Sequence, residues 1–78
     1  MKQELLEEFG KRLRHIRSSK DLTQVDLAYK GHFDRNYIGM LERGERNPSL
    51  KNLKRIADAL EISLSELLNF DNSDDKQE

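Results

Sequence analysis

The chain has 78 residues and no cysteine, and 35% of its residues are apolar while 37% are charged. This length suits one small domain, and the missing cysteines exclude disulfides and thiolate metal sites. No apolar run approaches the roughly 20 residues that span a bilayer and no signal peptide precedes the first helix, so we expect a cytoplasmic, all-α domain with no membrane partner.

The formal net charge of −1 hides an uneven distribution of charge along the chain. Residues 11–55 hold twelve Lys or Arg and five Asp or Glu, whereas both ends of the chain are acidic. A phosphate backbone responds to charges within about 8–10 Å, the Debye length in cellular salt, and not to the total charge. The basic middle of the chain is therefore compatible with nucleic acid, although any single Lys or Arg can equally serve to solvate a helix face.

A first helix is predicted over residues 3–19. Its apolar side chains recur every three or four residues and form one stripe: Leu6, Phe9, Leu13 and Ile16. Acidic residues crowd its start and basic residues its end, as the helix dipole favours. Arg14 and Arg17 either interact favourably with the negative end of that dipole or contact a phosphate.

A second helix is predicted to begin after Thr23, a good N-cap residue. Asp26 lies three residues further on, where its carboxylate can bond back to the first turn. We expect the buried side of this helix to consist of Val25, Leu27 and Ala28. The pair Gly31–His32 ends the helix.

A third helix follows at once, with Asp34 as its N-cap. Phe33 and Ile38 stand around that cap at the spacing of a hydrophobic staple. Ile38 and Leu41 are expected to face inward, and Gly44 ends the helix. The remaining side chains suit contact with a polar, anionic surface: Arg35, Asn36, Tyr37, Gly39, Met40 and Arg43. Two short helices joined by a tight turn, the second of them polar and partly basic, form the helix-turn-helix arrangement.

Residues 23–44, TQVDLAYKGHFDRNYIGMLERG, resemble the phage-repressor-like (XRE) helix-turn-helix family through the Thr-Gln opening, the Leu-Ala pair and the Leu-Glu-Arg-Gly ending. The resemblance extends over residues 5–70 and implies a five-helix, lambda-repressor-like DNA-binding domain. The shorter stretches DLAYK, DRNYI and ERGERN resemble the controller proteins of restriction–modification systems, which are small homodimeric transcription regulators. One departure is His32, which stands where the wider family usually has a turn glycine, although histidine tolerates a left-handed backbone better than most residues.

The front of the third helix is predicted to read DNA bases, because the first turns of a recognition helix enter the major groove most deeply. Arg35 has the planar fork that pairs with guanine, and Asn36 can pair with adenine or bond a phosphate. Met40 either touches a thymine methyl group or packs in the core. The candidates for base contact are therefore Arg35, Asn36 and Met40.

A second group of residues is predicted to hold the phosphate backbone: Thr23, Gln24, Tyr37, Arg43, Arg46 and Asn47. For Gln24 this role is implied by the resemblance, and the alternative is a solvent-facing residue beside a cap. The resemblance also supports phosphate contacts by Arg46 and Asn47, in the loop that follows the third helix. Tyr37 either donates to a phosphate or packs against the second helix. Glu42 is expected to be structural and paired with Arg17 or Arg46, because a carboxylate facing phosphates would weaken binding.

A fourth helix is predicted over residues 50–60, after Pro48, with Ser49 or Asn47 as its cap. Its expected buried face carries apolar residues at helical spacing: Leu50, Leu53, Ile56, Ala57 and Leu60. Lys51 lies near its start and either extends the phosphate contacts or is simply solvated.

Ser63 and Glu66 form a capping box for a short fifth helix. This helix carries more apolar side chains than two turns can bury against one small core, which indicates a two-fold interface between copies of the chain. The alternative is a firmly anchored last helix. The predicted interface residues are Leu64, Leu67, Leu68 and Phe70. The folded domain is expected over residues 1–70, and residues 71–78 are expected to be a disordered acidic tail.

Together these features predict a sequence-specific DNA-binding transcriptional regulator that acts as a homodimer on an inverted repeat, and the narrower resemblance implies restriction–modification genes as its targets. RNA polymerase, excluded or recruited, would be a further partner. The alternative is a protein-interaction or antitoxin module of the same fold. We expect no enzyme, metal or cofactor, because the chain has no cysteine nucleophile, no phosphate-binding glycine loop, and two histidines seventeen residues apart without carboxylates to orient them.

Overall fold

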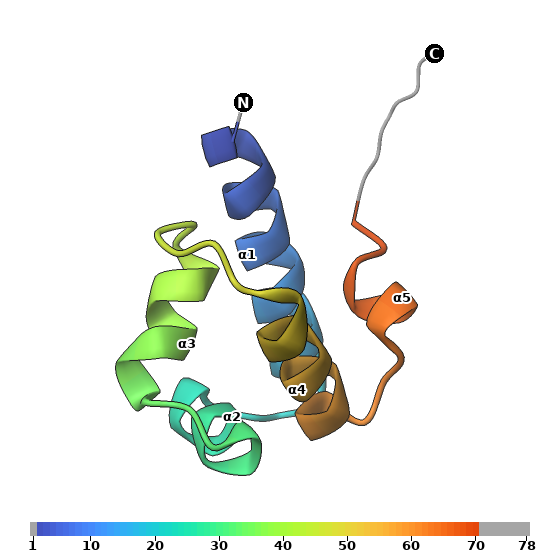
Figure 1. Cartoon of the computed structure of the whole chain (residues 1–78). Coiled ribbons are helices and arrows are strands. Elements are labelled where there is room, and N and C mark those ends of the chain that lie inside the picture. Colours follow the sequence, from blue (N-terminus) through green and yellow to red (C-terminus); the bar gives the residue numbers. More distant parts are fainter. Residues whose placement is uncertain (1, 71–78) are drawn as a thin grey trace.

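The computed structural model describes residues 2–70, so the predicted tail at residues 71–78 lies outside the described residues. Five helices follow one another along the chain: α1 (Lys2–Ser19), α2 (Gln24–Gly31), α3 (Arg35–Glu42), α4 (Leu50–Leu60) and α5 (Leu64–Leu67) (Figure 1). The described residues contain no strand, which confirms the predicted all-α, five-helix class. No helix among residues 2–70 combines the length and the apolar character that crossing a lipid bilayer requires.

The long helix α1 lies between α3 on one side and α5 on the other, and α2 packs against both α3 and α4 (Figure 1). Every helix contributes to one core of buried apolar side chains: Phe9, Leu13, Ile16, Leu27, Ala28, Ile38, Leu41, Ile56, Ala57, Leu60 and Leu67. Burying one large aliphatic side chain stabilises a fold by about 1.5–3 kcal/mol. Ile38 and Leu41 are completely buried, so the inner side of α3 is held firmly against the core.

Side-chain caps begin the last four helices at predicted residues, namely Thr23, Asp34, Ser49 and Ser63. At α2 both bonds of the capping box are made: the N–H of Asp26 donates to Thr23 Oγ1 at 3.0 Å, and the N–H of Thr23 donates to Asp26 Oδ2 at 2.9 Å. His32, the C-cap of α2, has the left-handed φ of 60° that the turn requires. Gly44 follows α3 with a φ of 75°, as its predicted role at the end of that helix implies.

Two apolar residues predicted to be buried are exposed, so these predictions were wrong. Val25 is 54% exposed and Leu50 is 70% exposed. At 100° per residue, Val25 points about 110° away from the mean direction of the buried side chains of α2, and Leu50 about 70° away from those of α4. Both also lie in the first turn of their helix, where fewer neighbouring elements are available to cover a side chain.

Two glycines allow α1 to pass directly over the end of α3. A Cβ atom on Gly10 would lie 2.4 Å from the carbonyl oxygen of Glu42, and one on Gly44 would lie 2.8 Å from Cγ of Glu7. The Gly10 approach is to backbone atoms, which cannot move aside as the end of a flexible side chain can. The close contact of α1 with α3 therefore fixes the height and angle of α3 in the domain.

Candidate nucleic-acid interface

The N-terminal turn of α3 is presented to solvent. Arg35 and Asn36 are exposed, and within residues 2–70 neither side chain has a hydrogen-bond or ion-pair partner. The carboxylate of Asp34 accepts the backbone N–H of Asn36 at 2.8 Å and so stabilises this turn. Met40, further along the same helix, is half-buried but is not part of the core cluster. Both predicted base-reading polar side chains thus keep their donors for an external acceptor.

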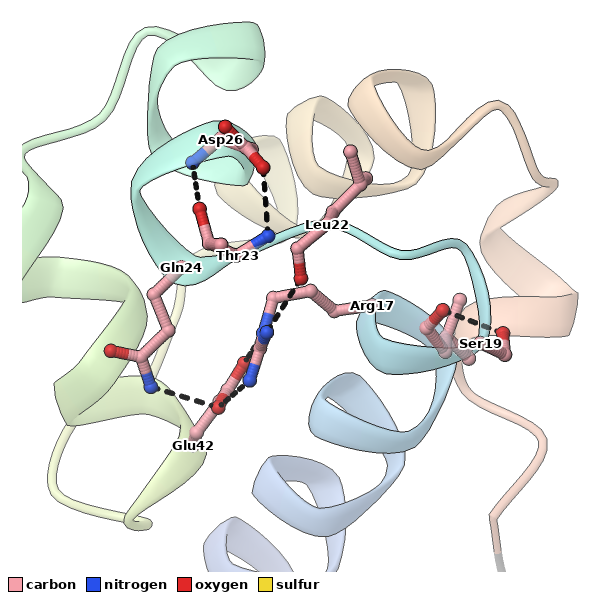
Figure 2. A network of polar contacts seen from close by, with 8 residues as sticks. Arg17, Ser19, Leu22, Thr23, Gln24, Asp26 and Glu42 are labelled. Atoms are coloured by element: carbon pink, nitrogen blue, oxygen red, sulfur yellow. Dashed lines mark hydrogen bonds and ion pairs between the residues drawn. The ribbon is translucent and has the colours of Figure 1, made fainter.

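Glu42, the last residue of α3, forms a nearly buried ion pair with Arg17 of α1 (Figure 2). Arg17 donates to both carboxylate oxygens, from Nε at 2.6 Å and from Nη2 at 3.0 Å, and its Nη1 donates to the carbonyl of Leu22 at 2.6 Å. The bonds to Glu42 raise the pKa of Arg17 above its usual value and outweigh the opposing effect of burial. The structural role predicted for Glu42 is confirmed, with Arg17 and not Arg46 as its partner. The alternative that Arg17 reaches a phosphate was wrong, because its guanidinium is turned into its own domain.

Gln24 joins this network from the start of α2. Its Nε2 donates to Glu42 Oε1 at 3.0 Å (Figure 2), and its Oε1 lies over Gly39, 3.3 Å from where a Cβ atom would stand. The amide nitrogen has a second hydrogen, and the first N–H groups of a helix have no acceptor within that helix. The predicted phosphate contact of Gln24 is therefore compatible with its bond to Glu42.

Tyr37 is enclosed by the turn before α3 and by the start of α4. Its ring stacks on Phe33, with the centroids 5.2 Å apart, and the guanidinium of Arg46 lies 5.7 Å from its centroid. Its hydroxyl oxygen accepts a hydrogen bond from Asn52 Nδ2 at 3.0 Å. The packing partners of Tyr37 are thus the turn and α4, and its ring and hydroxyl are held in one position.

Arg43, predicted to bind phosphate, forms an exposed ion pair with Glu45. Its Nε donates to Glu45 Oε2 at 2.9 Å and its Nη2 to Oε1 at 3.2 Å. These bonds raise the pKa of Arg43 and lower that of Glu45. A carboxylate thus occupies the position in which a phosphate would meet this arginine.

The remaining predicted phosphate contacts all lie on the surface: Thr23, Arg46 and Asn47 are exposed, as is Lys51 at the start of α4. Thr23 accepts the N–H of Asp26 through its hydroxyl oxygen and still has a hydroxyl hydrogen to donate. These residues come from the start of α2, which packs against α3, from the loop after α3, and from the start of α4, which the hydrogen bond of Asn52 joins to Tyr37.

The predicted interface residues on the α5 side differ in their burial. Leu67 is completely buried and belongs to the core of its own subunit, and Leu64 is half-buried against that core. Leu68 is 38% exposed, and Phe70 packs edge-on against Phe9 with the centroids 6.2 Å apart. An apolar groove of about 260 Å³ runs along this side, lined by Leu5, Leu6, Phe9, Asn47, Pro48, Leu53, Leu68 and Phe70.

Three polar residues at this surface did not stand out in the sequence: Glu45, Asn52 and Arg55. Arg55 donates to Asn52 Oδ1 at 3.3 Å and to the carbonyls of Gly31 and His32 at 2.8 and 2.7 Å. Asn52 and Arg55 are three residues apart in α4, so their pairing could have been anticipated from spacing. Their contacts with the turn and with Tyr37 cross 15 to 24 residues of chain and have no local signal.

Known proteins resemble this chain over most of its length. Residues 13–67 match the family described as "Helix-turn-helix". The control protein C.BamHI of Bacillus amyloliquefaciens is 43% identical over 63 residues, which cover 80% of this chain and 78% of that protein. The immunity repressor protein of Bacillus phage phi105 is 42% identical over 59 residues, and the match spans 76% of this chain but only 41% of the repressor. The crystal structure of the restriction-modification controller protein C.AhdI from Aeromonas hydrophila superposes with a TM-score of 0.78 at 48% identity, over 80% of this chain and 94% of that one.

Proposed function

Because the chain belongs to the helix-turn-helix family of DNA-binding transcriptional regulators, we propose that it binds one duplex DNA sequence as a homodimer and regulates transcription from that site. The front of α3 carries this proposal. Arg35 and Asn36 are exposed and have no partners within residues 2–70, while Ile38 and Leu41 hold the helix from behind. A firmly supported helix with unpartnered Arg and Asn side chains in its first turn suits the major groove.

The roles of the side chains follow from their chemistry. Arg35 would pair with the O6 and N7 atoms of guanine, Asn36 with adenine, and Met40 with a thymine methyl group. The residues around α3 would bind phosphates on both sides of the groove: Thr23, Gln24, Tyr37, Arg43, Arg46 and Asn47. Their exposed or half-buried side chains, and their positions on the elements next to α3, support this division of roles.

The homodimer would form through the α5 side. Leu5 and Leu68 are 59% and 38% exposed and line the apolar groove together with Phe70, so a second copy seated there would remove their apolar surface from water. Because α3 and α5 lie on opposite sides of α1 (Figure 1), two copies that meet at α5 would carry their α3 helices outward. Such a pair suits half-sites about one helical turn, ~34 Å, apart in an inverted repeat.

The similarity to known proteins supports a proposal for the target genes and for the location of the protein. Restriction-modification controller proteins are among the similar proteins and structures, so the genes of a restriction–modification system are the proposed targets. A regulator bound near a promoter meets RNA polymerase, either by blocking it or by recruiting it. A DNA ligand suits the proposed cytoplasmic location, and DNA binding requires no chemical reaction of the protein.

Selection of binding sites from random duplexes, followed by titration of the selected site against salt, tests this function. We expect an inverted repeat in the selected pool. Arg35→Ala should relax the preference at one base position by about 1–3 kcal/mol. Arg46→Ala should weaken binding to all sequences alike and reduce the salt slope by about one. Weak, unselective binding at physiological salt would overturn the proposal and favour a protein-interaction module.

Sedimentation equilibrium tests the dimer separately. Leu68→Glu places a charge in the apolar groove and should convert the protein into a monomer that binds single half-sites weakly. Leu50→Glu is the matched control, because Leu50 is 70% exposed and does not line the groove. Equal effects of the two substitutions would exclude the α5 side as the interface.

A further inference from the structure

A closed ring of contacts joins the start of α4 to Tyr37. Arg55 stacks on Phe33 with its guanidinium 4.1 Å from the ring centroid, and Phe33 stacks on Tyr37. Tyr37 accepts a hydrogen bond from Asn52, and Asn52 accepts one from Arg55. Arg55 is itself anchored by the carbonyl of Gly31 at the end of α2 and by that of the next residue. The ring therefore has a fixed position relative to the turn between α2 and α3.

The direction of each hydrogen bond in this ring follows from the chemistry of arginine. A guanidinium only donates, so the atom of Asn52 that faces Arg55 is its carbonyl oxygen, Oδ1. The amide nitrogen of Asn52 then faces the hydroxyl of Tyr37 and donates to it at 3.0 Å. A phenolic hydroxyl has one hydrogen, and that hydrogen points to neither Asn52 nor Arg55. Tyr37 is thus left as a donor toward an acceptor outside the ring.

We propose that Asn52 is a positioning residue for DNA binding: by donating to the hydroxyl of Tyr37, it directs the hydroxyl hydrogen to a phosphate oxygen of the DNA. A phosphate oxygen only accepts, so it is complementary to a hydroxyl whose oxygen is already engaged. The ring acts on the DNA through Tyr37, and Asn52 itself does not touch the phosphate. This inference rests on the proposed DNA-binding function and adds residues of α4 to the interface.

Inverting the direction of one bond separates this role from simple support of the ring. In Asn52→Asp the new carboxylate accepts from Tyr37, so the hydroxyl hydrogen turns inward and is lost to the phosphate. The variant is compatible with folding, because position 52 is the third residue of α4, where an acidic side chain favours the helix dipole. Asn52→Leu is the companion variant, since it removes the contact without supplying an acceptor.

The test is the cost of Tyr37→Phe for DNA affinity in three backgrounds, measured on the selected duplex at 0.15 M salt. In the parent chain we expect a loss of about tenfold, as for a hydrogen bond to a charged group. In the Asn52→Asp background the loss should shrink to less than about twofold, because the hydrogen bond to phosphate is already broken. In the Asn52→Leu background it should be intermediate, about threefold, because the hydroxyl hydrogen can still turn outward but is no longer directed there. The added negative charge of Asn52→Asp weakens both members of its pair alike and cancels in this comparison.

Equal losses in the parent and Asn52→Asp backgrounds would overturn the inference, as would a negligible loss in the parent. An unchanged loss in Asn52→Leu would also overturn it, because Asn52 would then not direct the hydroxyl of Tyr37. Thermal unfolding by circular dichroism monitors folding, and Asn52→Leu alone still tests the inference if Asn52→Asp does not fold. A parent chain that binds no selected duplex would instead refute the proposed function, so the two failures are distinguishable.

Discussion

Removal of the Glu42 carboxylate is expected to destabilise the domain strongly. The side chains of Glu42 and Arg17 are only 4% and 12% exposed, and Glu42 accepts two hydrogen bonds from Arg17 and one from Gln24. Breaking a buried pair by removing one partner costs about 3–5 kcal/mol, because the other charge stays buried without compensation. Since Arg17 retains some contact with water, we expect Glu42→Ala to cost about 3 kcal/mol. A domain of this size has a total stability on the order of 4–12 kcal/mol, so the loss is a large part of it.

Urea and thermal unfolding followed by circular dichroism measure this loss at a fixed protein concentration. At about 4–8 °C per kcal/mol, the midpoint temperature of Glu42→Ala should fall by roughly 12–24 °C. The double variant Arg17→Met/Glu42→Leu should recover most of it, because no charge is then left in the interior. Glu45→Ala is the matched surface control, since its pair with Arg43 is half exposed and should matter far less. A Glu42→Ala effect as small as that of Glu45→Ala would refute the idea that burial determines the strength of this pair.

Three further predictions concern charge, space and pH. Glu45→Gln releases Arg43 from its ion pair and should raise the affinity for all duplexes roughly fivefold. Fluorescence anisotropy should also show a steeper salt dependence of binding. Unchanged affinity would show that the ion pair does not compete with phosphate. Gly10→Ala should unfold the domain or sharply lower its midpoint temperature of unfolding, because the new methyl group meets backbone oxygens at 2.4 and 2.6 Å. Gly39→Ala is the control and should be tolerated, because its methyl group meets only flexible side-chain atoms at 3.1 Å or more. The bonds from Thr23 lower the pKa of Asp26 in the folded state, so the stability that they provide is present above the unfolded pKa of about 3.9 and is lost as the pH falls through the folded value. Urea unfolding between pH 6 and pH 2 should therefore show a shallower acid decline for Asp26→Asn, and an unchanged decline would contradict this role.

The sequence by itself determined most of the local structure, although α5 has only four residues and the bond back from Glu66 predicted for its capping box is not among its cap contacts. Thr23, Asp34 and Ser63 cap helices where predicted, and His32 takes the left-handed conformation at the end of α2. Caps, turns and helical stripes depend on groups within one or two turns of the chain, so their chemistry can be recognised in a single sequence. The exposed position of Arg35 at the front of α3 followed for the same reason.

Only the tertiary structure decided which of these local features meet. The bonds of Glu42 to Arg17 and of Asn52 to Tyr37 join residues 25 and 15 positions apart, and no local rule selects them among the alternatives that the sequence left open. Burial has the same origin: Leu67 is completely covered and Val25 is more than half exposed, although both belong to apolar patterns. The hydrophobic effect rewards apolar area removed from water, and the neighbours that remove it come from other helices. Spacing along one helix proposes a buried face, and the packing of the remaining helices determines it.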